Sequence, residues 1–247
     1  MNFFSLFKRN LIYKFKKKVS IDADQISLKS LDELFHHYGS DKAEIFKKTN
    51  QQGHGFSSFY EKKLERFKNK KINILEIGSY AGSSAAAFVK YLPNAQVFCF
   101  DINISNFKYK SKNIHVFSVD INNEKKIEKI LNKIFTIYEF EKFDLIIDDG
   151  SHNLKDILVS LKIFFKVLKK ESLYIIEDFK HPNYYKYNNN LEHIFVNEFL
   201  DNIERKKISP SSIFNDNEQK KLIDSIKKIE SYKGKLNDSD ICFVTKN

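Results

Sequence analysis

The sequence predicts an α/β fold of the Rossmann-like, doubly wound kind, with a mostly parallel seven-stranded sheet whose last strand is antiparallel. Three observations support this prediction. Apolar strand-like runs alternate with amphipathic helical runs from residue 72 onward, which is typical of a parallel sheet covered on both faces. A glycine turn, Gly78 to Gly82, joins the first strand to the next helix. A hairpin-like segment, GKLNDSD, separates the last two strands and favours an antiparallel end.

The individual elements follow from the spacing of apolar residues, which repeat at helical spacing in helices and form short dense runs in buried strands. The predicted strands are residues 72–77, 97–102, 115–121, 143–149, 172–178, 229–232 and 240–246. The predicted helices among them are residues 83–91, 123–137, 153–168, 191–206 and 216–228. No internal repeat or low-complexity linker interrupts this order.

Two helices precede the first strand and form an extension to the sheet. They are predicted over SLKSLDELFHHY (27–38) and over SSFYEKKLERF (57–67), with Ser57 as the N-cap of the second. A polar, glycine-bearing segment separates them. We therefore divide the chain into an N-terminal arm (1–26), a helical extension that contributes to the site (27–70) and an α/β domain (71–247).

The first 18 residues form a basic segment that contains large apolar side chains. They carry six Lys and Arg residues and no acid. Lys8 and Arg9 interrupt the apolar stretch and no small-residue cleavage site follows, so the segment does not fit a secretory signal. Two alternatives remain. The one we favour is an arm that is disordered or packed on the domain; the other is a basic amphipathic helix at an anionic membrane surface.

Composition sets limits on class and compartment. Of 247 residues, 42% are hydrophobic, with 24 Phe and 12 Tyr, which is ample for a core. The net charge of +10 fits nucleic acid, an anionic membrane or an anionic substrate, and equally a soluble lysine-rich surface. Cys99 and Cys242 lie in apolar runs without metal-binding spacing, which indicates buried reduced thiols in a cytosolic protein. No apolar run approaches the roughly 18 residues of a membrane span.

The strand–turn–helix unit at residues 72–91 predicts a site for one small molecule, because turn N–H groups and a helix N-terminus converge there. Asp101 lies 23 residues after Gly78, where a carboxylate can accept both ribose hydroxyls of a nucleoside. Asp120, near the end of the third strand, is placed to meet an adenine amino group. The turn lacks Gly-x-Gly-x-x-Gly spacing, so it suits a nucleoside without pyrophosphate better than NAD.

A second cluster lies in IIDDGSH (146–152) and YIIED (174–178). Asp149, Glu177 and Asp178 offer hard oxygen ligands on neighbouring strand ends, which suits Mg²⁺. His152, three residues after Asp149, is predicted to begin the next helix and to take a proton from a hydroxyl nucleophile. The alternative is that His152 merely caps a helix and the acids are solvated strand-end residues. Acids at or near five predicted strand ends are, in order, Glu76, Asp101, Asp120, Asp148, Asp149, Glu177 and Asp178.

These motifs resemble those of the class I S-adenosylmethionine-dependent methyltransferases. The runs that carry the likeness are LEIGSYAGSS (75–84), FDI (100–102), IIDDGSH and YIIED. With YGSDK (38–42) and HGFSSFYE (54–61), the chain is more narrowly similar to the macrolide sugar O-methyltransferases and their cephalosporin-hydroxylase-like relatives. The likeness runs from about residue 30 to 180 and more loosely to the end.

The resemblance implies two bound groups and a role for each motif. It implies S-adenosylmethionine at Glu76, Gly78, Gly82, Asp101 and Asp120, with Ser83 and Asp148 placed in the same cofactor set. It implies Mg²⁺ at Asp149, Glu177 and Asp178, with His152 as general base. The chain departs from the family at the turn before the fifth strand, where Lys169-Lys170-Glu171-Ser172 replaces a common Pro-Gly-Gly, and at Phe56, where a Tyr is common. The first change lies in a distal turn and the second bears on the cofactor or substrate pocket.

We therefore expect a magnesium-dependent O-methyltransferase acting on a sugar hydroxyl, in a cell-surface polysaccharide or a glycosylated small molecule. Residues 180–190 are either a lid over the acceptor or a plain surface loop. Two alternatives stay open, a methyltransferase for RNA or another anionic acceptor, and a nucleoside-binding scaffold without chemistry. The partners expected are a small-molecule or glycan acceptor and a second copy of the chain, but not nucleic acid. The expected location is the cytoplasm, including the inner face of the membrane.

Overall fold

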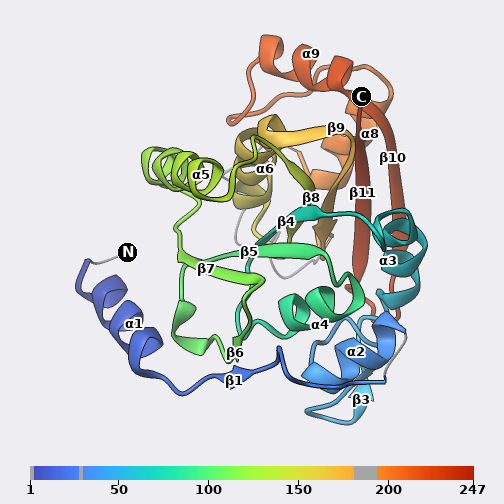
Figure 1. The fold of residues 1–247 in the computed structure, drawn as a ribbon. Helices are drawn as coiled ribbons and strands as arrows, with labels where there is room; N and C mark the ends of the chain where they lie inside the picture. Colours follow the sequence, from blue (N-terminus) through green and yellow to red (C-terminus); the bar gives the residue numbers. More distant parts are fainter. Residues whose placement is uncertain (1–2, 28–29, 181–193) are drawn as a thin grey trace. The chain divides into compact units, whose positions relative to one another are not determined.

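The computed structural model describes residues 3–27, 30–180 and 194–247, and Figure 1 traces their course. Seven strands form one sheet in the order β10-β11-β9-β8-β4-β5-β7. The chain divides into two compact units, Met1–Asp120 with Gly234–Leu236, and Ile121–Lys233 with Asn237–Asn247. The predicted fold class, a mostly parallel seven-stranded sheet with an antiparallel last strand, is thus confirmed. The predicted boundaries at residues 26 and 70 both fall within the first unit and stay predictions.

The sheet strands of the first unit are β4 (Ile72–Ile77), β5 (Ala95–Asp101) and β7 (Ile114–Ser118). They run parallel, with Ile77 opposite Phe100 and Asp101 opposite Ser118. Most side chains of β4 and β5 are buried, which is why these two strands appear in the sequence as continuous apolar runs rather than as alternating ones. The sequence predicts β4 to the residue. It extends β7 to residue 121, whereas the strand ends at Ser118.

Helices α2 (Leu31–Tyr38), α3 (Ser57–Leu64) and α4 (Ser83–Tyr91) pack beside these strands through aromatic rings. Phe35 meets Phe88 at 5.4 Å between ring centroids, and Tyr60 meets Phe88 at 5.5 Å. All three rings are fully buried. They therefore tie the predicted helical extension to α4 with a dry core.

Helix starts in this unit follow different rules. Ser30 caps α2 in a capping box with Glu33, a pattern that satisfies two N–H groups at once. The prediction that Ser57 caps α3 is wrong, because the cap residue is Phe56 and Ser57 is the first helical residue. Its hydroxyl instead donates to the Asp32 carboxylate at 2.6 Å.

Short elements complete the first unit. They are α1 (Phe3–Phe15), β1 (Val19–Ser20), β2 (Ile45–Phe46), β3 (Gln51–Gln52), β6 (Tyr109–Lys110) and the 3-10 turns η1 (Glu65–Phe67) and η2 (Ile104–Asn106). β1 pairs in parallel with β6, and β2 pairs with β3. Gly234–Leu236 belongs here because the Lys235 N–H donates to the His54 carbonyl at 2.8 Å and the Lys235 ammonium pairs with Glu44.

The second unit contains β8 (Phe143–Asp148), β9 (Leu168–Glu177), β10 (Ile226–Lys233) and β11 (Asp240–Lys246). β8 and β9 are parallel, with Ile147 opposite Ile175, while β11 is antiparallel to both β9 and β10. β9 begins four residues earlier than the predicted residue 172. The sequence gives no apolar signal there because the extra residues, Leu168-Lys169-Lys170-Glu171, are mostly charged.

The helices of the second unit are α5 (Glu124–Tyr138), α6 (Leu154–Phe164), α8 (Val196–Glu204) and α9 (Asp216–Ser225). α6 stops four residues before the predicted residue 168 and continues as the 3-10 turn η3 (Phe165–Val167). The predicted helix 216–228 also ends early, because Ile226 begins β10 and pairs with Lys246. Of the predicted segments 180–190 and 191–206, residues 181–193 lie outside the described residues.

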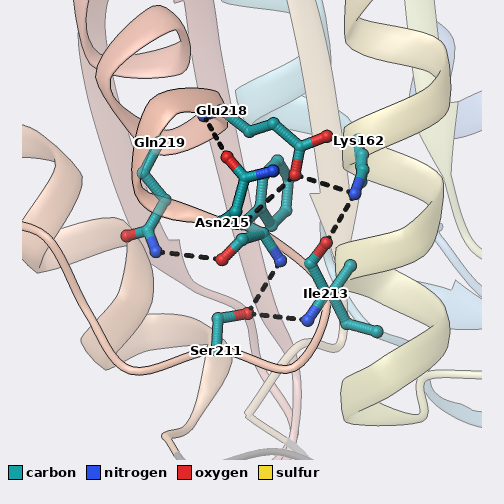
Figure 2. A network of polar contacts seen from close by, with 7 residues as sticks. Lys162, Ser211, Ile213, Asn215, Glu218 and Gln219 are labelled. Atoms are coloured by element: carbon teal, nitrogen blue, oxygen red, sulfur yellow. Dashed lines mark hydrogen bonds and ion pairs between the residues drawn. The ribbon is translucent and has the colours of Figure 1, made fainter.

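The start of α9 is held by the polar network of Figure 2. Asn215 accepts the Glu218 N–H at 3.0 Å, and the Glu218 carboxylate accepts the Asn215 N–H at 3.0 Å. Lys162 on α6 donates to Glu218 at 2.8 Å and to the Ile213 carbonyl at 2.6 Å. The Lys162 ammonium holds the pKa of Glu218 below its usual range. This network fixes the 205–215 connection to α6.

No helix among the described residues is both long enough and apolar enough to span a membrane.

We expect His115 on β7 to make the fold acid-sensitive. Burial lowers the pKa of His115 to about 4, and its Nε2 hydrogen bonds to the Gln96 side chain at 2.9 Å. Between pH 4 and its ordinary pKa near 6.5 the folded imidazole stays neutral while the unfolded one binds a proton, so stability falls as pH drops through this window. As the pH falls through this range, the free energy of unfolding should therefore decrease less for His115→Gln than for wild type. Urea denaturation measures this difference.

The matched control is His37→Gln, because the His37 side chain is exposed on α2. Identical pH profiles for wild type and His115→Gln would contradict the expectation.

Candidate functional site

The turn after β4 is held against the end of β5 by its own main chain. The Gly78 N–H donates to the Phe100 carbonyl at 2.8 Å, and the Tyr80 N–H donates to the Asp101 carboxylate at 2.7 Å. Gly78 has φ +85°, and Tyr80 has φ +41°, a region that side chains other than glycine seldom occupy. The turn is therefore locked in shape before any ligand binds.

Gly82 is required by packing as well as by the turn. It caps α4 with φ +74°, and a Cβ placed on it would lie 2.3 Å from a ring atom of Phe107. No side chain fits at that distance. The structure thus explains Gly82 without a ligand, and its predicted place in the cofactor set stays a prediction.

Glu76 is the buried acid of this turn. Its side chain is fully buried on β4, where the Ser84 hydroxyl on α4 hydrogen bonds to it and the Ser79 hydroxyl donates to its carbonyl at 3.1 Å. Burial, together with the neighbouring Glu76, raises the pKa of the Cys99 thiol well above its usual value. Cys99 therefore stays a neutral thiol at physiological pH.

Asp101 accepts main-chain donors with both carboxylate oxygens, from Tyr80 at 2.7 Å and from Asn103 at 2.5 Å. Each carboxylate oxygen has a second lone pair, so the predicted ribose hydroxyls can still be accepted. Asp120 lies two residues beyond the end of β7, half-buried, and the preceding Val119 N–H donates to the Asp101 carbonyl at 3.0 Å. Ser83 is the first residue of α4 and lies near the Tyr109 hydroxyl, which donates to the Tyr38 carbonyl at 2.7 Å.

In the second unit, a group of metal-binding side chains converges within the part of the chain that the structure describes. Asp149, His152 and Asp178 each present one ligand atom, and these atoms all lie within 4.8 Å of one another. Asp149 follows β8 and Asp178 follows β9. The Asp178 N–H donates to the Asp240 carbonyl at 2.7 Å, which fixes that end of β9 to β11. Two carboxylates and an imidazole are thus gathered at adjacent strand ends.

His152 is oriented by its other nitrogen. Nδ1 lies 3.2 Å from the Glu177 carbonyl oxygen, and Nε2 lies 3.6 Å from the Asp149 carboxylate. A carbonyl only accepts hydrogen bonds, so Nδ1 carries the proton in this contact and Nε2 faces the acids. The second-nitrogen bond is the usual way in which proteins fix a ligating or basic imidazole.

Two of the three residues in this group have strained backbones. His152 has φ +56° and Asp178 has φ +51°, which costs on the order of 1–3 kcal/mol for each residue. Such strain clusters at functional sites, where the surrounding structure holds it in place. The prediction that His152 begins a helix is wrong, because α6 starts at Leu154 with Asn153 as its N-cap.

Asp148 lies just before this group and is almost wholly buried at the end of β8. The Tyr174 hydroxyl donates to it at 3.3 Å and lies 3.0 Å from the Ser160 hydroxyl. Burial raises the pKa of Asp148 to about 7, although these hydroxyls and His152 oppose the shift. Its contacts among the described residues are those of an internal network, and its predicted role with the cofactor stays a prediction.

Glu177, predicted as a metal ligand, is not in the converging group. Its side chain is 1% exposed and its carbonyl accepts from His152. The sequence reasoning also missed Tyr174 and Ser160 as partners of Asp148. A weak signal existed for one of them, since Ser160 is a polar residue within the apolar face of α6. For Tyr174 the apolar strand pattern concealed the role.

The fold and a family model together define the protein family of this chain. A Rossmann-like sheet with a tight glycine turn and polar groups at its strand ends is typical of α/β proteins that bind a small molecule. A family model described as FtsJ-like methyltransferase matches residues 60–196. The chain therefore belongs to the FtsJ-like methyltransferase family, which confirms the predicted class of enzyme.

Curated relatives are sugar O-methyltransferases by name. The mycinamicin VI 2''-O-methyltransferase of Micromonospora griseorubida is 25% identical over 132 residues, covering 51% of this chain and 31% of the relative. The L-olivosyl-oleandolide 3-O-methyltransferase of Streptomyces antibioticus is 28% identical over 155 residues, covering 60% of this chain and 36% of the relative. The predicted resemblance to this subgroup is confirmed. The chain spans about a third of the length of these relatives.

Solved structures of MycE methyltransferase from the mycinamycin pathway share the fold. The complex with Mg and S-adenosylhomocysteine (SAH), crystal form 2, has a TM-score of 0.66 at 19% identity, over 89% of this chain and 54% of that one. The complex with Mg, SAH and mycinamycin VI has a TM-score of 0.62 at 19% identity, over 89% and 55%.

We expect Asp101→Ala to weaken binding of S-adenosylhomocysteine at least tenfold. Hydrogen bonds to a charged group contribute about 1.5–3 kcal/mol each, so losing the ribose pair exceeds one factor of ten in affinity. Isothermal titration calorimetry measures the change. The matched control is Asp22→Ala in the same unit, because Asp22 also holds a loop, through Ser111 and the Lys112 N–H. Equal affinity of Asp101→Ala and wild type would refute the ribose assignment.

We expect Asp149→Asn and Asp178→Asn each to weaken Mn²⁺ or Mg²⁺ binding at least about tenfold, because amides are poorer ligands for hard cations than carboxylates. Glu128→Gln, an exposed site on α5, is the control and should bind as wild type does. Glu177→Gln distinguishes two sets of metal ligands. The set predicted from the sequence includes Glu177, whereas the converging group does not. Calorimetry on the folded variants, checked by circular dichroism, gives the affinities. Undiminished binding by Asp178→Asn would rule out the converging group as the metal site.

Proposed function

We propose that this chain is an S-adenosylmethionine- and Mg²⁺-dependent O-methyltransferase that acts on a sugar hydroxyl. The observation that carries the proposal is the convergence of Asp149, His152 and Asp178 within 4.8 Å in a chain of a methyltransferase family. A cofactor turn alone is compatible with many acceptors. Two acids beside a base suit an acceptor that must lose a hydroxyl proton.

The donor set fits the implied metal. Mg²⁺ is usually held by one or two carboxylates, with water or substrate in its other positions. Asp149 and Asp178 supply two carboxylates from neighbouring strand ends, and the lone pair of His152 Nε2 faces the same point. When bound, Mg²⁺ would bind acceptor oxygens and make a hydroxyl more acidic.

The chain's own residues then have defined tasks. The Glu177 carbonyl would hold the Nδ1 proton of His152, so that Nε2 would accept the proton of the acceptor hydroxyl. S-adenosylmethionine, when bound, would supply the methyl group that the deprotonated acceptor oxygen takes, and S-adenosylhomocysteine would be the leaving group. Asp101 and the Gly78–Gly82 turn would hold the nucleoside and so restrict the motion of its methyl group.

Two observations on the turn after β4 support binding of S-adenosylmethionine there. The turn is pre-formed by bonds from Gly78 and Tyr80 to β5, so little ordering is needed on binding. Asp101 keeps acceptor capacity for hydroxyl donors. Glu76, Gly82, Ser83, Asp120 and Asp148 remain the other proposed members of the cofactor set.

A glycosylated small molecule is the acceptor class we favour. The curated relatives are named as methyltransferases of sugars on macrolide or polyketide scaffolds. They include the 8-demethyl-8-alpha-L-rhamnosyl tetracenomycin-C 2'-O-methyltransferase of Streptomyces olivaceus, which is 24% identical over 163 residues. It covers 63% of this chain and 39% of the relative. A cell-surface polysaccharide has the same reacting group and is the second acceptor tested. We place the reaction in the cytoplasm, since Cys99 and Cys242 are free, buried thiols.

We expect His152→Ala to lower kcat by roughly 10²–10⁴-fold, the usual contribution of a positioned base. Binding of S-adenosylhomocysteine should be unchanged. Transfer of labelled methyl groups to glycosylated macrolides, nucleotide sugars, polysaccharide fragments and RNA, read by mass spectrometry, gives both the rate and the acceptor. His37→Ala is the control for removal of an imidazole.

A chelator distinguishes the need for a metal in methyl transfer from the binding of the cofactor. Excess chelator should stop methyl transfer while S-adenosylhomocysteine still binds, and Mg²⁺ should restore turnover. Full activity in chelator would exclude the metal-dependent reaction. Transfer to RNA but to none of the sugars would replace the proposed acceptor, and cofactor binding without any transfer would indicate a scaffold.

A further inference from the structure

Helix α1 has two faces with opposite roles. Arg9, Tyr13 and Lys16 recur at i, i+4 and i+7, the spacing of one helix face. The Arg9 guanidinium lies 3.4 Å from the Ile102 carbonyl, and the Lys16 ammonium donates to the Ser105 carbonyl at 2.9 Å. The Tyr13 ring packs edge-on against Phe107 at 6.4 Å between centroids. This face fixes α1, shown in dark blue in Figure 1, to η2.

The outward face of α1 is apolar and exposed. Phe7, Leu11 and Phe15 recur at i, i+4 and i+8, and their exposed fractions are 61%, 46% and 75%. Ile12 beside them is 45% exposed, and Val19 just beyond is 57% exposed. Five of the large hydrophobic residues exposed in the described chain thus lie within residues 7–19. Isolated exposed apolar residues are normal, but a contiguous set marks an interaction surface.

Cationic side chains border this apolar face. Lys8, Lys14 and Lys17 are exposed on the helix or directly after it. Lys108, Lys110 and Lys112 are exposed on the segment around β6, with which β1 pairs. Ser20 of β1 pairs with Lys110 of β6, and burial together with the charges of Lys110 and Lys16 lowers the pKa of Lys18. The acid at this edge, Asp22, is engaged with Ser111 and the Lys112 N–H.

We propose that the outward face of α1 binds an anionic lipid surface and brings the protein to it. An apolar stripe bordered by lysines is the composition of a helix that lies in the headgroup region, with its apolar side chains buried and its cations at the phosphates. Nucleic acid would use the cations but leave the phenylalanines exposed. A second copy of this chain would bring like charges together. The lipid surface satisfies both features of the face.

The test is co-sedimentation of the full chain with vesicles. Wild type should bind vesicles of phosphatidylcholine with phosphatidylglycerol at least tenfold more tightly than vesicles of phosphatidylcholine alone. Raising the salt to about 1 M, where the Debye length falls to about 3 Å, should weaken that binding. Leu11→Ser with Phe15→Ser, and separately Lys8→Gln with Lys17→Gln, should each reduce binding to the anionic vesicles at least tenfold.

Matched controls come from helix α5. Ile137, 57% exposed, is the apolar control as Ile137→Ser, and exposed Lys129 and Lys133 are the charge controls as Lys129→Gln with Lys133→Gln. All should bind as wild type does. Because the substituted side chains are exposed, the melting temperature should not change, and circular dichroism checks this.

Equal binding to both vesicle types, or undiminished binding by Leu11→Ser with Phe15→Ser, would overturn the proposal. So would self-association in light scattering that disappears in this variant while vesicles are never bound, since the face would then join two copies of the chain. None of these readouts uses methyl transfer, so they do not depend on the proposed function.

Discussion

The two candidate sites depend on one physical constraint, the pairing of buried strand-end acids with hydrogen-bond donors inside the protein. A carboxylate withdrawn from water is costly unless donors replace the water. Asp101 receives two main-chain N–H groups, and Glu76 receives a helix hydroxyl. Asp148 has hydroxyl donors, and burial raises its pKa to about 7 although these donors and His152 oppose the shift. At each of these three acids, donors inside the protein therefore take the place of water.

Three strands of the sheet are followed by residues with strained backbones. Tyr80, His152 and Asp178 have positive φ, and they follow β4, β8 and β9. In each case a turn in the left-handed region directs an N–H or an imidazole toward a fixed acceptor, at Asp101, Glu177 or Asp240. The strain is local, while the bonds that hold it belong to strands buried in the sheet. In each case a hydrogen bond to a residue of a neighbouring strand holds the strained turn in place.

Sequence alone predicted the sheet because its signals are local and strong. β4, α4 and β11 match their predicted bounds to the residue, since each is bounded by a glycine, a charge or a polar turn. What failed depends on contacts between distant residues. Ser57 does not cap α3 because Asp32, 25 residues away, attracts its hydroxyl. His152 does not begin α6 because its ring binds the Glu177 carbonyl, and no spacing rule shows that bond.

In the group of Asp149, His152 and Asp178, the imidazole can act either as a metal ligand or as a base. Imidazole as a ligand favours cations softer than Mg²⁺, whereas two carboxylates alone suit Mg²⁺ with water in its other positions. With Nδ1 protonated against Glu177, the single lone pair on Nε2 serves either a metal or a substrate proton, but not both at once. If His152 is the base, the metal rests on Asp149 and Asp178 and the site selects a hard cation. The role of one nitrogen therefore fixes both the proton path and the metal.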